Sequence, residues 1–178
     1  TNRNNSIENT RNIIAFSDLG ESQQFNCQGN PGNYSTDIIP RNESNGLYDW
    51  ASNQPLVRGF ANSVGVLSSQ FTSPGPFNQA VEYEKLENAR RLEQSDYTYN
   101  ALLGYISLNT PLNNDEVLSV AYEYTYRGET YQIGEFSTDG STGQDALILK
   151  LLKPTITNPN NKVWDLMMKN VYSIGAYQ

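Results

Sequence analysis

The sequence contains no histidine and a single cysteine, Cys27, among its 178 residues. Without histidine the chain has no Ser-His or Cys-His nucleophile system and no His-based zinc site. One cysteine forms neither an internal disulfide nor an all-cysteine metal site, so we interpret Cys27 as a buried or incidental thiol. These absences exclude most hydrolase mechanisms, and we expect no enzyme, cofactor or metal site.

Positive charge is also scarce, because 12 Lys and Arg stand against 19 Asp and Glu, for a net charge of −7. Such a chain repels phosphate backbones and anionic lipid head groups, so we expect no nucleic-acid partner. No apolar run approaches the roughly 20 residues of a membrane helix, and no signal segment opens the chain. We therefore expect the chain itself not to be inserted in a membrane. Thr1 in place of an initiator Met indicates a piece excised from a longer protein.

Hydrophobic residues are few, at 37%, but the 12 tyrosines supply large apolar rings. The polar surface comes from Asn, Gln, Ser and Thr, a balance typical of extracellular β domains. We predict frayed residues over 1–11 and one β-rich domain over 12–178. Within it, 21–80 is rich in Gly, Pro, Asn and Ser and is expected to form long loops, whereas 81–178 carries hairpins and one helix.

The clearest element is a hairpin within Glu116–Phe136. Alternation places a set of apolar side chains on one face of its first strand, namely Leu118, Val120, Tyr122, Tyr124 and Tyr126. If Arg127 and Gly128 form a tight turn, Tyr124 lies opposite Tyr131 and Tyr122 lies opposite Ile133. We expect these tyrosines to pack inward, beneath the C-terminal helix described below.

Other short elements follow from local patterns. Strands are predicted at Asn12–Phe16, Val64–Leu67, Asp96–Asn100, Gly104–Leu108 and Ala146–Leu152, the last ending before Pro154. Leu47–Trp50 is expected to form one helical turn. Val81–Leu92 is ambiguous, since its residues are good helix formers although Val81, Tyr83 and Lys85 also alternate as on a strand; propensity alone favours the helix.

Near the C-terminus, Asn161 is positioned to cap a helix that ends near Gly175. Its apolar stripe consists of Trp164, Met167, Met168, Val171 and Tyr172. The predicted fold class is mainly β (α+β): an antiparallel sandwich-like or meander sheet with this amphipathic helix packed on it, and long loops.

Three groups of residues carry side chains of the types used in catalysis or binding. The acidic residues Glu82, Glu84 and Glu87, and the pair Asp115 and Glu116, are compatible with a glycosidase but fit a solvated face better. Asp139–Asp145 is a Gly-rich acidic loop that offers oxygens to Ca²⁺ but lacks EF-hand spacing, so a plain turn is favoured. Tyr48 and Trp50 either stack on a sugar or, as we favour, pack in the core. We therefore assign no catalytic, cofactor or metal residues.

Three long segments carry a family resemblance. They are Leu86–Leu92 with Asp96–Asn109, Asn114–Tyr126 with Gln132–Ser137, and Trp164–Tyr177. Together they resemble the SprA (Sov) family of large cell-surface proteins from gliding bacteria. The resemblance covers Ile13–Glu21 and Val81–Gln178, and no match is found over 21–80.

This resemblance implies a part of the outer-membrane translocon of the type IX secretion system, which serves protein secretion and gliding motility. The implied partners are the rest of the parent translocon and associated secretion proteins, at the cell surface and on the extracellular side of the outer membrane. The resemblance implies that the parent protein is a very large transmembrane β-barrel. This chain lacks a series of lipid-facing strands of about ten residues, so we expect it to be a globular insertion between the barrel strands. The resemblance also favours a strand at Val81–Leu92. The alternative function is a carbohydrate-binding cell-surface β-sandwich module.

Overall fold

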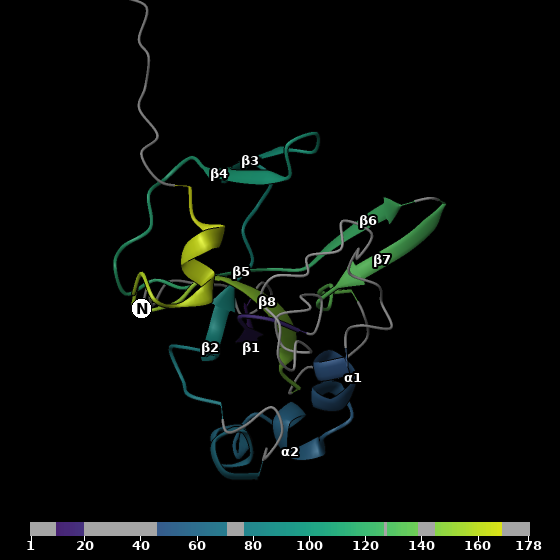
Figure 1. Cartoon of the computed structure of the whole chain (residues 1–178), viewed down its shortest axis with the longest axis vertical. Coiled ribbons are helices and arrows are strands. Elements are labelled where there is room, and N and C mark those ends of the chain that lie inside the picture. The colour runs from purple at the N-terminus through teal and green to yellow at the C-terminus, as the bar shows by residue number, and fades with distance from the viewer. Residues whose placement is uncertain (1–9, 20–45, 71–76, 127, 139–144, 169–178) are drawn as a thin grey trace, which may run out of the picture.

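The computed structural model describes residues 10–19, 46–70, 77–126, 128–138 and 145–168, and these form a mainly β structure (Figure 1). Its strands are β1 (Thr10–Phe16), β2 (Tyr83–Arg90), β3 (Tyr97–Asn100), β4 (Tyr105–Leu108), β5 (Leu118–Val120), β6 (Tyr122–Tyr126), β7 (Glu129–Ile133) and β8 (Leu147–Lys153). Its helical segments are α1 (Gly46–Ser52), α2 (Pro55–Arg58), α3 (Ser63–Gly65), the π-helix η4 (Val66–Gln70) and the 3₁₀ helix η5 (Lys162–Leu166).

A four-stranded sheet with the order β2-β1-β8-β5 forms the centre of the described structure. β1 runs antiparallel to β2 but parallel to β8, with Ile13 beside Leu147, and β5 runs antiparallel to β8. The sheet is therefore mixed, and the predicted purely antiparallel sheet is wrong at the β1–β8 pair. That pair joins strands far apart in the sequence, which local alternation does not reveal.

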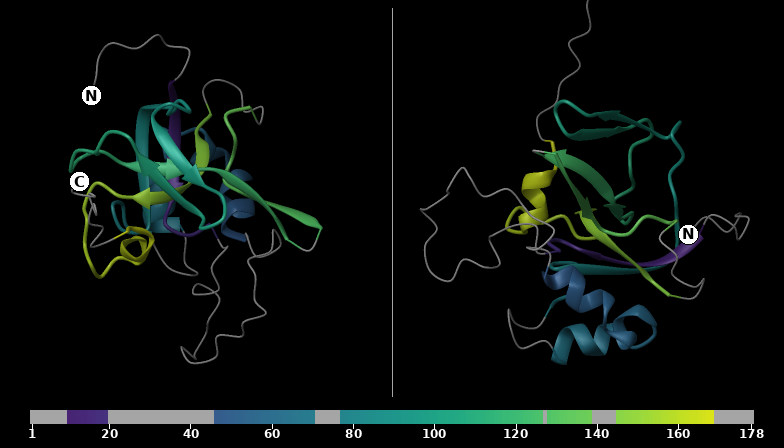
Figure 2. Two further views of the ribbon diagram at one scale, coloured as in Figure 1. Left: turned by 90° about the horizontal axis from the view of Figure 1, so that it is seen from above. Right: turned by 90° about the vertical axis from the view of Figure 1, so that its right-hand side faces the viewer.

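Both faces of this sheet are covered, as the nearly continuous apolar sequences of β1 and β8 require. On one face Ile14, Phe16 and Ile148 are buried in a cluster with Val57 and Leu67 of the helical segments. On the other face Ala15 and Leu151 are buried with Val163 of η5. Figure 2 shows α1 and α2 on one side of the sheet and η5 on the other.

The β6–β7 hairpin has the predicted register. Tyr124 pairs with Tyr131 and Tyr122 pairs with Ile133, and Gly128 adopts a φ of +86° in the turn. The Tyr124 and Tyr131 rings stack with centroids 5.1 Å apart. The predicted long first strand is divided at Ala121, because β5 pairs with β8 whereas β6 pairs only with β7.

These tyrosines do not lie beneath the C-terminal segment, as was expected. Tyr131 is buried and Tyr124 packs against the cluster on the helical side of the sheet, whereas Val163 of η5 packs on the opposite side. Tyr122 is exposed. The inward packing is thus confirmed for Tyr131, but the expectation that the C-terminal helix covers these tyrosines was wrong.

Two short strands predicted in the middle of the chain are confirmed as the β3–β4 ribbon. The Gly104 N–H donates to the Asn100 carbonyl at 2.8 Å, and the Asn100 Oδ1 accepts from the Leu103 N–H at 2.9 Å. Gly104 adopts a φ of +64°, the left-handed conformation that this turn needs. The ribbon stands at one end of the molecule, away from the four-stranded sheet (Figures 1 and 2).

Within the segment 81–92, residues Tyr83–Arg90 form the strand β2. The preference for a helix from propensity is therefore wrong, and the strand that the family resemblance implies is confirmed over Tyr83–Arg90. Pairing with β1 overrides the helix-forming tendency of these residues. The opposite error occurs at Val64–Leu67, which is helical, with Val66 and Leu67 buried. Short apolar runs of this kind do not distinguish a strand from a buried helix.

Helical segments occupy 46–70, where mainly loops were expected; the turn at Leu47–Trp50 is confirmed within α1. β1 begins at Thr10, inside the range expected to fray. The strand at Ala146–Leu152 is confirmed as β8, one residue further along.

The amphipathic C-terminal helix is not supported. Lys162–Leu166 form only a 3₁₀ turn, and Met167 is extended, with φ −89° and ψ 132°. Asn161 makes no side-chain cap, although its carbonyl accepts from the Trp164 N–H at 2.8 Å. The buried residue is Val163, whereas Met168 of the expected stripe is exposed. Val171, Tyr172 and Gly175 lie outside the described residues.

Candidate functional site

The carboxylate of Glu135 is a buried polar group with several hydrogen-bond partners; it follows Gly134 after β7 and is only 5% exposed. The backbone of Glu135 pairs with β8 through its N–H, which donates to the Ile148 carbonyl at 2.9 Å. The Ile148 N–H in turn donates to Glu135 Oε2 at 2.9 Å. The side chain is thereby held against β8 of the main sheet.

Two side chains from the helical segments complete this site. Arg58 donates from Nη1 to Glu135 Oε2 at 2.8 Å and from Nη2 to Glu135 Oε1, forming a bidentate ion pair. The Tyr48 hydroxyl donates to Glu135 Oε1 at 3.1 Å. We call Tyr48, Arg58 and Glu135 the polar clamp, since it connects α1 and α2 to the strands β7 and β8.

The pKa of each side chain that donates to Glu135 in the clamp is raised above its ordinary value. Burial, followed by the negative charge and hydrogen bond of Glu135, raises the pKa of Tyr48 to about 12. The hydrogen bond with Glu135 raises the pKa of Arg58 further above its ordinary range. Tyr48 therefore stays protonated and Arg58 stays charged at neutral pH.

The carboxylate of Glu135 uses all of its hydrogen-bonding capacity within the clamp. The Glu135 carboxylate accepts from Arg58 Nη1, Arg58 Nη2, Tyr48 and Ile148, and four is the full capacity of a carboxylate. Arg58 also donates from Nε to the Ser52 carbonyl at 3.0 Å, and its own carbonyl accepts from the Ala146 N–H at 2.9 Å. The arrangement fixes the helical segments to the sheet, and its carboxylate has no lone pair left for a substrate.

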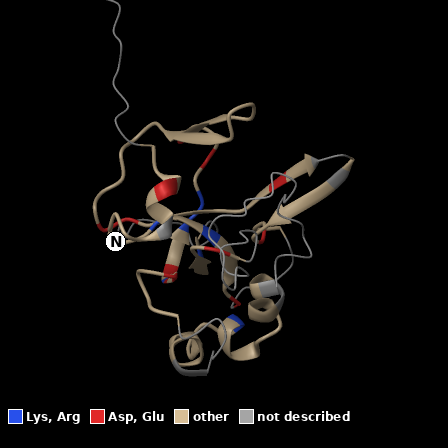
Figure 3. Cartoon of the chain, in the orientation of Figure 1, with Lys and Arg blue, Asp and Glu red and all other residues tan. Residues whose placement is uncertain are grey.

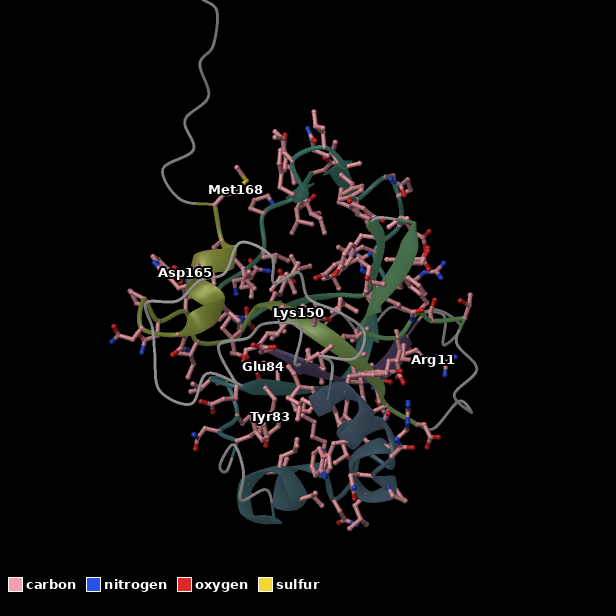
Figure 4. The ribbon with its side chains drawn as sticks, turned by 45° about the vertical axis from the view of Figure 1, so that its right-hand side comes forward. Arg11, Tyr83, Glu84, Lys150, Asp165 and Met168 are labelled. Atoms are coloured by element: carbon pink, nitrogen blue, oxygen red, sulfur yellow. The ribbon has the colours of Figure 1, made fainter. Side chains whose placement is uncertain are left out.

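Two further buried charged side chains form hydrogen bonds to backbone groups of other segments. Glu84 is 2% exposed and accepts from the Thr155 N–H at 2.7 Å, while Lys150 donates from Nζ to the Ser17 carbonyl at 2.5 Å. Neighbouring residues of β2 point to opposite sides, so that Glu84 lies towards the C-terminal segment and Tyr83 towards the helices (Figure 4).

The acidic residues considered from the sequence are mostly engaged in local structure. Glu82 accepts from the Asn78 N–H at 2.7 Å, and Glu116 accepts from the Asn113 N–H at 2.8 Å. Glu87 and Asp115 are exposed. Glu82, Glu84 and Glu87 belong to or precede β2, whereas Asp115 and Glu116 precede β5, at the opposite edge of the sheet. The structure does not bring the two groups together.

The aromatic residues considered for sugar binding lie on α1 and pack against the core. Tyr48 and Trp50 are partly buried against the cluster that contains Phe16 and Ile148, and the Tyr48 hydroxyl belongs to the clamp. The packing interpretation of these two rings is therefore confirmed. Cys27 and residues 139–144 of the candidate Ca²⁺ loop lie outside the described residues.

The sequence reading missed the clamp residues Arg58 and Glu135. Arg58 lies in the segment expected to form loops, and Glu135 is one of many acidic residues. The available signal was the position of Glu135 between Ile133-Gly134 and Phe136, an apolar setting that is unusual for a solvated carboxylate.

No family model matches this chain, and a search of curated proteins finds no significant match. Among the described residues, no three His, Cys, Asp or Glu side chains gather in a way that suits a metal ion. No helix in the described ranges is long and apolar enough to cross a membrane.

Proposed function

We propose that this chain is a non-enzymatic structural domain of an outer-membrane protein-export translocon of the type IX secretion system, which serves protein secretion and gliding motility. The observation that carries the proposal is the resemblance of Ile13–Glu21 and Val81–Gln178 to the SprA (Sov) family. Its partners are the rest of its parent protein and associated secretion proteins, and its location is the extracellular side of the outer membrane.

The arrangement of the strands supports this proposal. The two resembling segments are separated in the sequence by about sixty residues that show no resemblance, yet they supply neighbouring strands, with β1 between β2 and β8. The helices of 46–70, which lie in the unmatched part, attach to this sheet through the polar clamp. A framework of strands that resembles the family and carries a helical insertion without that resemblance is consistent with both observations.

The chemistry of the clamp also supports a structural role. Its carboxylate, guanidinium and phenol are used to join elements of the domain, as are Glu84 and Lys150. The two aromatic residues that the sequence offered for sugar binding, Tyr48 and Trp50, pack in the core and therefore do not support the alternative, a carbohydrate-binding module. Glycan-array binding that is lost on Trp50→Ala would restore that alternative.

The test is made in the full-length parent protein. Replacing residues 1–178 by a short Gly-Ser linker is expected to abolish or strongly reduce secretion and gliding while the parent remains in the outer membrane, as measured by immunoblotting of membranes and medium. The matched control, Leu56→Ser at an exposed position of α2, is expected to leave both unchanged. Normal export and gliding by the deletion strain, at a normal level of the parent, would contradict the proposal.

Location is tested separately. Asn160 lies on an exposed turn, so Asn160→Cys in a Cys27→Ser background supplies one accessible thiol. A membrane-impermeant thiol reagent is expected to label this variant on intact cells. Labelling only after the outer membrane is permeabilised would place the domain in the periplasm.

A further inference from the structure

The tip of the β3–β4 ribbon is the most exposed apolar feature of the described residues. Leu102 is 93% exposed and Leu103 is 70% exposed, and both lie in the turn between the two strands. Isolated exposed apolar residues are ordinary, but two adjacent leucines at the end of a projecting ribbon are not. Both side chains therefore lie mostly in solvent at the end of the ribbon.

The strands behind this tip continue the apolar character on one face. Their register places Tyr99 opposite Ile106 and Tyr97 opposite Leu108, and these four side chains share a face of the ribbon. Tyr99 is 56% exposed. Tyrosine has an apolar ring and a polar hydroxyl, and it is enriched at the boundary between lipid and water. The ribbon therefore presents leucines at its end and tyrosines behind them.

The ribbon carries no charge along its length. Residues 97–114 contain no Asp, Glu, Lys or Arg, in a chain whose net charge is −7, and Figure 3 shows β3 and β4 free of both charge colours. Charged residues begin only at its base, where Arg90 pairs with Asp96 at 2.8 Å. The cost of moving a charge out of water therefore does not oppose entry of the tip into a neutral apolar medium.

Hydrogen bonds also fix the backbone conformation of the turn at the tip. Asn100 holds the turn through two hydrogen bonds, accepting from the Gly104 N–H with its carbonyl and from the Leu103 N–H with its side chain. Two backbone donors of the turn are thus satisfied internally, as a low-dielectric surrounding requires. The base is braced by the Asn109 N–H, which donates to the Asp96 carbonyl at 2.9 Å. These hydrogen bonds hold the turn that carries the two leucines.

We propose that the β3–β4 ribbon docks on a lipid bilayer surface with neutral, zwitterionic head groups, with Leu102 and Leu103 entering the acyl boundary and Tyr97 and Tyr99 at the head-group level. The contact is peripheral and involves the tip alone. The order of leucine, tyrosine and then charge along the ribbon matches the change in polarity across a bilayer interface. The acidic charge of the chain disfavours an anionic surface. This proposal does not rest on the proposed function of the domain.

The experiment uses the whole 178-residue chain and phosphatidylcholine vesicles, with binding measured by co-sedimentation. The wild type is expected to bind, and Leu102→Ser/Leu103→Ser to lower the partition coefficient by about tenfold or more, given the transfer free energy of a leucine side chain. Leu56→Ser, which alters an exposed leucine of α2 at the other end of the molecule, is the matched control and is expected to change nothing. Binding is expected to be insensitive to salt, because the tip is uncharged.

A second pair of measurements separates lipid from protein docking. Partition into lipid follows hydrophobicity rather than shape, so Leu102→Trp is expected to bind vesicles at least as well as the wild type. A polarity-sensitive fluorophore on Leu102→Cys, in a Cys27→Ser background, is expected to shift to the blue with vesicles. Absent vesicle binding by the wild type, or equal losses in the tip and Leu56 variants, would overturn the proposal. Self-association that the tip variant abolishes, without vesicle binding, would identify a protein contact and also overturn it.

Discussion

Arg58 and Glu135 form a bidentate ion pair between residues 77 positions apart, with Nη1 to Oε2 at 2.8 Å. The pair joins α2 to the chain that follows β7, and the Tyr48 hydroxyl and the Ile148 N–H complete the shell of the carboxylate. Because Glu135 is buried, removing one partner leaves the other as an uncompensated charge or an unsatisfied donor. The stability of the domain should therefore be unusually sensitive to this pair.

Glu135→Ala is expected to lower the free energy of unfolding by about 3–5 kcal/mol, as for other broken buried ion pairs. Arg58→Ala is expected to be similarly damaging, and the double variant to lose less than the sum, because the two residues act together. Urea unfolding measures all three. The control is Arg90→Ala, which breaks the exposed pair with Asp96 and should change the unfolding midpoint little. Equal effects at the two pairs would contradict the role given to the clamp.

The register of the β6–β7 hairpin could be predicted because it depends on a short turn and on alternation within one stretch of sequence. The β3–β4 ribbon and β8 were predictable for the same local reason. The parallel pairing of Ile13 with Leu147 was not, since it depends on segments from opposite ends of the chain. Local pattern describes the two hairpins, whereas the four-stranded sheet depends on pairing between distant segments, which only the structure shows.

The same dependence on nonlocal contacts explains why the polar clamp could not be predicted from the sequence. Glu135 and Arg58 each look ordinary in the sequence, and only the fold brings them together with Tyr48. Conversely, the helix expected from Asn161 had a good periodic stripe, but the chain becomes extended at Met167. The C-terminal 3₁₀ turn instead packs on the sheet through the buried side chain of Val163. Tertiary packing decides both cases against the local pattern.

The titration of Tyr48 makes the stability of the domain depend on pH in the alkaline range. Its pKa is raised from the ordinary 10.0 to about 12, so the fold favours the protonated phenol. The stability that this contributes is complete below about pH 10 and is lost as the pH rises through about 12. Tyr48→Phe is expected to flatten this loss in urea midpoints measured across that range, while costing about 1.5 kcal/mol at neutral pH through the missing hydrogen bond to Glu135.

Burial also raises the pKa of Tyr83, so some alkaline loss should remain in the Tyr48→Phe variant. Titration of phenolate absorbance in the folded protein provides the direct check, because the wild type should show one more late-titrating tyrosine than Tyr48→Phe. If Tyr48→Phe instead removed a tyrosine that titrates near the ordinary pKa of 10.0, Tyr48 would not be held in the clamp.

Gly134 is required by both conformation and space. Its φ is +78°, and a Cβ at this position would lie 3.2 Å from the Ala121 Cβ and 3.3 Å from the Val120 carbonyl oxygen. Gly134→Ala is expected to lower the free energy of unfolding by about 2–3 kcal/mol, which combines left-handed strain with overpacking. Gly128→Ala, with a φ of +86° but open space around the added methyl, should cost only about 1 kcal/mol.

A compensating change tests the steric part of that prediction. Ala121→Gly in the Gly134→Ala background removes the nearest atom and should recover part of the lost stability in urea unfolding. No recovery, together with equal costs at Gly134 and Gly128, would leave conformational strain as the whole cause.

Val163 holds the C-terminal 3₁₀ turn to the sheet. Its side chain is 1% exposed and packs with Ala15 and Leu151, whereas Met168 is 63% exposed. Val163→Ala is expected to lower the free energy of unfolding by about 1–3 kcal/mol through lost burial and the cavity that remains. Met168→Ala is expected to stay within about 0.5 kcal/mol, as for other surface changes. A continuous amphipathic helix would give the reverse order, because Met168 belongs to its buried stripe and Val163 does not. Measuring both variants by urea unfolding therefore distinguishes the anchored turn from the helix that the sequence pattern favoured.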